Sequence, residues 1–119
     1  MPTSNALQIA ITGASGLVGS TLTKKLASLG YNVKRFVRTK SQNSLNEIYW
    51  NPKSSELNPR DLENIDAIVH LAGENIVAKR WSESFKKEIR DSRIQGTKLL
   101  VERILQLPTP PKSFIAASA

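Results

Sequence analysis

The stretch Ile9-Ala10-Ile11-Thr12-Gly13-Ala14-Ser15-Gly16-Leu17-Val18-Gly19-Ser20 decides the fold, because an apolar run leads through three glycines into a helical pattern. A strand that turns tightly into a helix leaves the first helical N–H groups without internal partners, at the positive end of the helix dipole. The glycine spacing, Gly-x-x-Gly-x-x-Gly, is a variant of a known phosphate-binding fingerprint. The stretch therefore predicts a binding site for an anion.

The segments around this stretch alternate between strand and helix patterns. A strand over 7–12 leads into a helix that begins at Leu17 and ends at Gly30, with apolar residues at helical spacing up to Leu29. Further along, the patterns predict a strand at 32–38, a short strand at 47–50, a helical turn at 58–63, a buried strand at 65–73, a helix at 82–107 and a strand at 112–119.

This alternation predicts one α/β domain over residues 1–119, with the Rossmann-like doubly wound topology. We expect about five parallel strands with helices on both faces. Ligands of such sheets bind at the carboxyl ends of the strands. The glycine stretch, Arg38, residues 71–73 and Ser118 all fall at predicted strand ends, so we expect them to lie along one edge.

Composition narrows the class of ligand. The chain has 119 residues and a formal net charge of +7, which suits an anionic ligand, although a solvated basic surface would give the same charge. No cysteine is present, which excludes disulfides and thiolate chemistry. The N-terminal residues show neither a signal peptide nor a membrane span, so a soluble cytoplasmic protein is expected.

Two residues inside apolar patterns invite a structural interpretation. His70 is the only histidine, but it lies within a predicted buried strand, so we expect a hydrogen-bonded core residue and assign it no chemistry. Gly96 interrupts the long helix, which indicates close packing against the sheet.

Five motifs together resemble the short-chain dehydrogenase/reductase superfamily, and within it the atypical extended branch known as the NAD-dependent epimerase/dehydratase family, "epimerase family protein" subgroup. The resemblance covers nearly the whole chain. The motifs are Thr12–Gly19, His70–Ile76, Arg80-Trp81, Ser92–Thr97 and Ile115–Ala119.

The resemblance implies a dinucleotide cofactor whose pyrophosphate lies against the glycine stretch. Gly13 would make the turn and Gly19 would allow close contact between helix and sheet. The backbone N–H groups of four residues would hold the pyrophosphate, namely Ser15, Gly16, Leu17 and Val18. The adenine and ribose side would be lined by Leu71, Ala72 and Gly73.

Arg38 stands where NAD-preferring relatives carry an acid for the ribose 2′-hydroxyl. A guanidinium can bind a 2′-phosphate that a carboxylate would repel, so we expect NADP (NADPH) rather than NAD, with Lys40 or Arg35 as additional contacts. An exposed basic loop is the alternative interpretation. On the long helix, Arg93 replaces the family's usual Asn and would reach the cofactor, with Glu88 one turn earlier as its partner or in a plain surface ion pair.

The resemblance also implies catalysis by a Ser or Thr at the end of the last strand and a Tyr-x-x-x-Lys pair on a later helix. Ser118 matches the serine. Tyr49-Trp50-Asn51-Pro52-Lys53 fits the pair as text, but Pro52 disfavours helix there, so we interpret Tyr49 and Trp50 as strand residues. We therefore expect the chain to be the cofactor-binding part of a longer protein and to be inactive alone.

Three functional hypotheses follow. The first is an NADP(H)-dependent oxidoreductase or epimerase that transfers a hydride at a hydroxyl or carbonyl carbon of a small molecule. The second is a noncatalytic NADP(H)-binding regulatory module. The third, nucleic-acid binding through the positive charge, lacks interleaved aromatic residues and is set aside, as are a membrane partner and a metal site. Self-association into a homodimer through the long helix or the sheet edges is a further hypothesis.

Overall fold

The computed structural model describes residues 7–14, 16–39, 46–71 and 83–116, with the backbone alone described for 83–93. Its elements are β1 (Gln8–Thr12), α1 (Leu17–Ser28), β2 (Asn32–Val37), β3 (Glu47–Asn51), the 3-10 helix η1 (Pro52–Ser54), β4 (Glu56–Leu57), the 3-10 helix η2 (Pro59–Leu62), β5 (Ala67–His70), α2 (Glu83–Ile104) and β6 (Ser113–Ala116).

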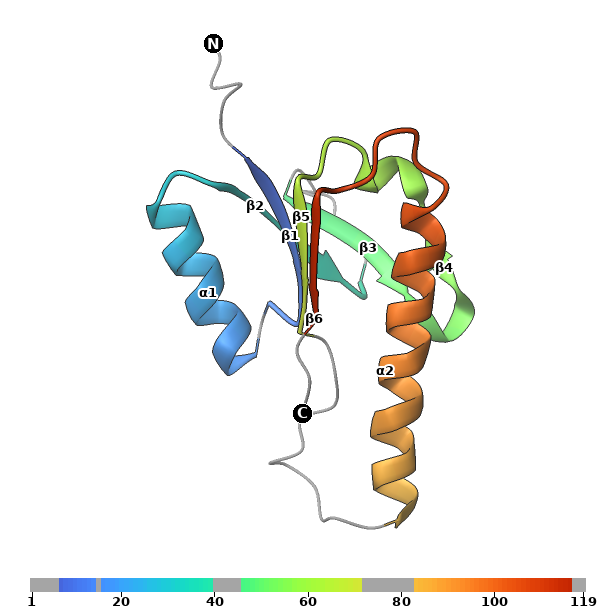
Figure 1. The fold of residues 1–119 in the computed structure, drawn as a ribbon. Coiled ribbons are helices and arrows are strands. Elements are labelled where there is room, and N and C mark those ends of the chain that lie inside the picture. Colours follow the sequence, from blue (N-terminus) through green and yellow to red (C-terminus); the bar gives the residue numbers. More distant parts are fainter. Residues whose placement is uncertain (1–6, 15, 40–45, 72–82, 117–119) are drawn as a thin grey trace.

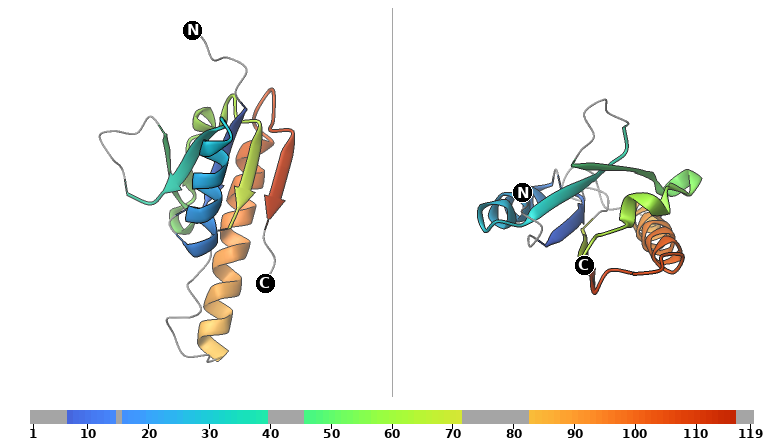
Figure 2. Two further views of the ribbon diagram at one scale, coloured as in Figure 1. Left: turned by 90° about the vertical axis from the view of Figure 1, so that its left-hand side faces the viewer. Right: turned by 90° about the horizontal axis from the view of Figure 1, so that it is seen from above.

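The strands form one six-stranded sheet in the order β4-β3-β2-β1-β5-β6. Five of them, β1, β2, β3, β5 and β6, run parallel to one another. The helices α1 and α2 lie on opposite faces of the sheet (Figures 1 and 2). The predicted Rossmann-like α/β fold is therefore confirmed.

The sheet differs from the prediction at one edge. β4 pairs antiparallel with β3, through Trp50 opposite Leu57 and Asn51 opposite Glu56, so the sheet is mixed and has a sixth strand. Pro52 starts η1 directly after β3, and this single turn reverses the chain into β4. A strand of two residues has no side-chain periodicity, which is why the sequence pattern did not predict it.

Several helices and strands end at other residues than the sequence predicted. The helix expected to extend to Leu107 ends at Ile104, and the chain then leaves the helix toward three nearby prolines. β5 ends at His70, so Leu71 follows the strand rather than belonging to it. β6 covers Ser113–Ala116, the described part of the strand predicted for 112–119.

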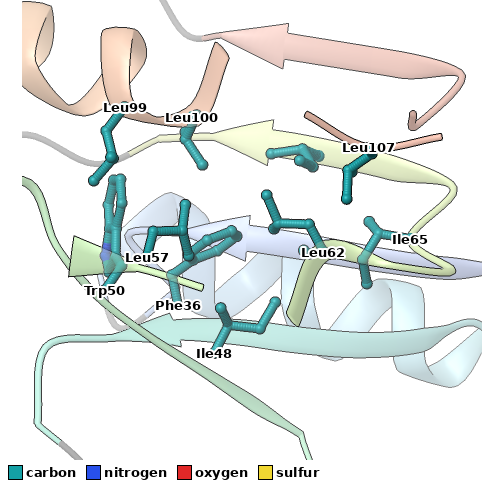
Figure 3. Packing of buried hydrophobic residues seen from close by; sticks show 11 residues of the cluster. Phe36, Ile48, Trp50, Leu57, Leu62, Ile65, Leu99, Leu100 and Leu107 are labelled. Carbon is teal, nitrogen blue, oxygen red and sulfur yellow. The ribbon is translucent and has the colours of Figure 1, made fainter. Parts of the chain in front are cut away.

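The larger core lies between the sheet and α2 (Figure 3). Alternate residues of the strands point to this face, and Leu99 and Leu100 of α2 pack against them with at most 2% of their surface exposed. The cluster consists of Ala10, Phe36, Ile48, Trp50, Leu57, Leu62, Ile65, Ile68, Leu99, Leu100 and Leu107. Residues from every strand except β6, together with Leu62 at the end of η2 and Ile65 after it, thereby fix α2 on the sheet.

The smaller core lies under α1, where Ile9, Ile11 and Ala14 are buried and Leu22 and Leu26 pack against them. The predicted apolar face of this helix was partly wrong at its ends. Leu17, Val18 and Leu29 are 87%, 65% and 60% exposed, because they occupy the first turn and the residue after the last turn, beyond the part of α1 that covers the sheet. The exposed pair at the start of α1 borders the glycine turn.

Arg103 joins α2 to the η1–β4 segment. Its Nε donates to the carbonyl oxygen of Leu57 at 2.8 Å, and its second guanidinium nitrogen donates to that of Ser55 at 2.9 Å. Ser55 has a left-handed backbone with φ of 57°, so its carbonyl is part of a tight turn that no ladder hydrogen bond covers. Sequence patterns gave no sign of this contact.

Replacing Arg103 should therefore destabilise the protein. We expect Arg103→Ala to lower the free energy of unfolding by about 1.5–3 kcal/mol, the usual value for hydrogen bonds from a charged donor. Urea denaturation followed by circular dichroism measures the change. Lys98→Ala, which removes an exposed cation from the same helix, is the control and should change it by less than about 0.5 kcal/mol. Equal small effects in both variants would contradict this role.

Candidate functional site

The predicted site residues within the described part of the chain gather at one edge of the sheet. Because β1, β2, β5 and β6 are parallel, their carboxyl ends lie together. The glycine turn follows β1, Arg38 follows β2 and Leu71 follows β5. The N-terminal half of α2 extends beyond this same edge (Figure 1). The predicted convergence of separate segments is thus confirmed for these residues.

The glycine turn leads directly into α1. Gly13 has φ of 69°, a left-handed backbone that favours glycine, and its carbonyl oxygen accepts from the Gly16 N–H at 3.1 Å. Gly16 is the N-cap residue, and no side chain caps the helix or places an acid in its first turn among the residues that the structure describes. The positive end of α1 therefore faces the sheet edge, and its own first turn contributes no carboxylate to neutralise it.

Gly19 packs against the backbone of the turn. A Cβ atom at this position would lie 2.0 Å from the Gly13 oxygen and 2.8 Å from the Cα of Ala14. Both neighbours are backbone atoms, so neither can turn aside. Only glycine lets the first turn of α1 approach β1 this closely, as the sequence predicted.

This contact predicts unequal effects of two similar substitutions. Gly19→Ala should lower the free energy of unfolding by about 3 kcal/mol or more, because the helix must move away from the turn. Gly16→Ala is the matched control, since a Cβ there would meet the Gly13 oxygen at an ordinary 3.5 Å. It should cost less than about 1 kcal/mol. Thermal and urea denaturation measure both, and equal stabilities of the two variants would refute the close approach.

The ends of β1 and β5 are tied by a hydrogen-bonded cluster. The buried Thr12 hydroxyl lies 2.7 Å from Nδ1 of His70 and accepts from the Leu71 N–H at 2.9 Å. His70 is 5% exposed, so the expected core histidine with a hydrogen-bond partner is confirmed. Gly96 of α2 lies against it, as its predicted close packing required: a Cβ there would be 3.4 Å from the His70 ring. The sequence analysis did not predict the hydrogen bond between Thr12 and His70. A threonine at the end of an apolar strand could have indicated that its hydroxyl has a buried partner.

The basic residues near the end of β2 differ in their surroundings. Arg38 is exposed beside the sheet edge. Arg35, expected as an additional contact, instead forms an ion pair with Glu47 of β3 at 3.0 Å. The other Glu47 oxygen, Oε1, is buried and has no partner within the described residues, so the arginine is the carboxylate's counter-ion. Arg38 is thus an exposed cation after β2, Arg35 is paired with Glu47, and Lys40 lies outside the described residues.

For the remaining predicted site residues, the structure describes only the backbone of two. Ser15, Ala72, Gly73 and Ser118 lie outside the described residues. Glu88 and Arg93 belong to α2 by their backbone, but their side chains are not described.

The segment that matches Tyr-x-x-x-Lys in sequence, Tyr49 to Lys53, runs from β3 into η1 and does not form a catalytic pair on a helix. Tyr49 lies in β3 and Lys53 in η1, so the two residues do not share a helix, as predicted. The Tyr49 hydroxyl donates to the Glu56 carboxylate at 3.0 Å, and this hydrogen bond raises the pKa of Tyr49 above 10.0. A catalytic tyrosine in this kind of pair needs a lowered pKa, so Tyr49 is unsuited to that role.

The described ranges carry neither a metal cluster nor a membrane-spanning helix. Those residues include no group of three or more His, Asp or Glu side chains arranged to hold a metal ion. None of the helices there has both the length and the apolar character that a bilayer span requires.

The comparisons with known proteins agree with the fold and the glycine turn. The model of the NAD-dependent epimerase/dehydratase family matches residues 9–119. The chain belongs to this family. An epimerase family protein of Mycobacterium leprae is 40% identical over 93% of the chain, and human SDR39U1 is 35% identical over 92%. The chain spans 35% and 36% of their respective lengths, about a third of each.

Two solved structures superpose on the chain. The crystal structure of human SDR39U1 with NADPH has a TM-score of 0.75 and 33% identity, covering 92% of this chain and 36% of that one. MoeE5 in complex with UDP-glucose and NAD has a TM-score of 0.72 and 32% identity, covering 94% of this chain and 36% of that one. Membership of the family supports a nicotinamide dinucleotide as the class of cofactor.

Proposed function

We propose that the chain is the NADP(H)-binding part of an epimerase-like oxidoreductase that transfers a hydride at a hydroxyl or carbonyl carbon of a small molecule. One observation carries the proposal: the start of α1, which no described side chain caps, lies directly after a glycine turn whose packing excludes any larger residue at position 19. Such a helix start attracts a diphosphate through backbone N–H groups and the helix dipole. Family membership supports the same cofactor class.

Each residue has a proposed role. Gly13 and Gly19 shape the turn, and the diphosphate lies against the backbone of Ser15, Gly16, Leu17 and Val18. The adenosine side is lined by Leu71, Ala72 and Gly73, and Glu88 and Arg93 approach from α2. Ser118 is the residue proposed to orient the substrate oxygen, and the substrate and the hydride step belong to the longer protein.

The proposed preference for NADP(H) rests on charge. Arg38 follows β2 in place of an acid, it is exposed, and the neighbouring Arg35 is already paired with Glu47. A guanidinium beside the ribose adds charge-assisted hydrogen bonds to a 2′-phosphate that NAD lacks. The structure of human SDR39U1 contains NADPH whereas that of MoeE5 contains NAD, so structural neighbours of the chain differ in cofactor, and we assign the choice in this chain to Arg38.

A homodimer is part of the proposal. Ile94, Val101 and Leu105 are 58%, 41% and 79% exposed on and just after the solvent side of α2. Apolar side chains gathered on one helix face favour self-association.

The cofactor preference can be measured directly. We expect the chain to bind NADPH about ten- to a hundredfold more tightly than NADH, the ratio that charged hydrogen bonds of about 1.5–3 kcal/mol produce. Arg38→Ala should bring the two dissociation constants within about threefold, mainly by weakening NADPH. Isothermal titration calorimetry at low ionic strength gives both constants.

Arg60→Ala is the control, because it removes an equally exposed arginine from η2 and leaves the sheet edge unchanged. Its ratio should match that of the unmodified chain. Equal affinities for NADPH and NADH in the unmodified chain would overturn the preference, and binding of neither would overturn the proposed function.

A further inference from the structure

His70 lies at the junction of three elements that border the site. Its ring packs edge-on against Trp50, with centroids 6.1 Å apart, and lies 6.2 Å from the ring of Phe114 on β6. On the helix side, a Cβ at Gly96 would lie 3.4 Å from Cε1 and 3.6 Å from Nε2 of His70. The imidazole, on the last residue of β5, therefore fills the space between β3, β6 and α2.

Packing alone does not explain a histidine here. A phenylalanine would fill a space bounded by Trp50 and Phe114 without burying polar atoms, and an imidazole buried this deeply is costly unless its nitrogens are hydrogen-bonded. The Nδ1 atom makes such a bond, at 2.7 Å to the Thr12 hydroxyl. The hydrogen bond to Thr12 thus explains why position 70 carries a histidine and not an apolar ring.

The Thr12 hydroxyl contacts both His70 and the backbone of Leu71. Its Oγ1 atom accepts from the Leu71 N–H at 2.9 Å, closer than the 3.3 Å from the same N–H to the Thr12 carbonyl oxygen. Thr12 immediately precedes the Gly13 turn, and Leu71 is the first residue after β5. Whichever of the two side chains carries the shared hydrogen, the bond to Nδ1 fixes the rotation of the hydroxyl and therefore the lone pair that Leu71 uses.

We propose that His70 is a positioning residue of the dinucleotide site, which acts through the Thr12 hydroxyl to hold the chain after β5 against the glycine turn after β1. The proposal rests on the proposed function, because it concerns the same site. His70 touches neither cofactor nor substrate in this role. It sets the spacing between the diphosphate side and the adenosine side of the site.

Three variants separate positioning from packing. His70→Phe keeps a ring in the pocket and removes Nδ1, whereas His70→Asn keeps a polar atom near the place of Nδ1 and leaves a cavity. We expect His70→Phe to weaken NADPH binding about tenfold and His70→Asn to stay within about threefold of the unmodified chain. The melting temperature should fall more in His70→Asn, because of the cavity. Ile48→Val, a cavity in the core away from the site, should lower the melting temperature and leave the affinity unchanged.

Affinity and stability should therefore rank the two His70 variants in opposite orders. In addition, Thr12→Val should weaken NADPH binding, and His70→Phe in the Thr12→Val background should weaken it by less than a further twofold, because both remove the same hydrogen bond. An affinity that follows the melting temperature across all variants, or additive effects of the two substitutions, would overturn the proposal.

A second readout needs no cofactor. Amide hydrogen exchange at Leu71, followed by NMR, should become about tenfold faster in His70→Phe relative to the amide of Phe36 in β2, and the ratio should be nearly restored in His70→Asn. If NADPH does not bind but this pattern is found, the proposed function fails and the positioning role stands. Unchanged relative exchange at Leu71 in His70→Phe would refute the positioning role itself.

Discussion

The first turn of α1 lies so close to the end of β1 that a single methyl group at position 19 would overlap the Gly13 carbonyl. This contact fixes where the helix begins and in which direction its N–H groups point. With Gly13 in a left-handed conformation, the chain turns within a few residues from a strand buried on both faces into an exposed helix start. The rest of the described sheet edge is arranged around that start.

Parallel pairing brings other segments of the chain to this turn. Because β2 and β5 flank β1 in the same direction, Arg38 and Leu71 are brought to the glycine turn from segments far apart in the sequence. The Thr12–His70–Leu71 cluster then links two of these strand ends by hydrogen bonds, of which the one between Thr12 and His70 is buried and therefore stronger than on the surface. Family membership and the superposition on human SDR39U1 agree with this arrangement.

Sequence patterns predicted the elements that long periodic segments encode. The apolar runs of β1 and β5 and the helical spacing in α1 and α2 identified the order of strands and helices, and the glycine stretch identified the turn. What the sequence did not reveal depends on contacts between distant segments. β4 is too short for any period, Arg103 caps carbonyl groups about fifty residues away in sequence, and Arg35 is held by a carboxylate on another strand. His70 was predicted as a core residue, but its link to Thr12 needs the pairing of β1 with β5.

We propose above all that the start of α1 binds the diphosphate of a nicotinamide dinucleotide. A titration of the ¹⁵N-labelled chain with NADPH, followed by two-dimensional amide NMR, tests it residue by residue. We expect the largest shifts at the amides of Gly16, Leu17 and Val18, with smaller shifts in β3 and β4. Shifts confined to residues away from the carboxyl edge of the sheet, with these three amides unchanged at saturating NADPH, would contradict it.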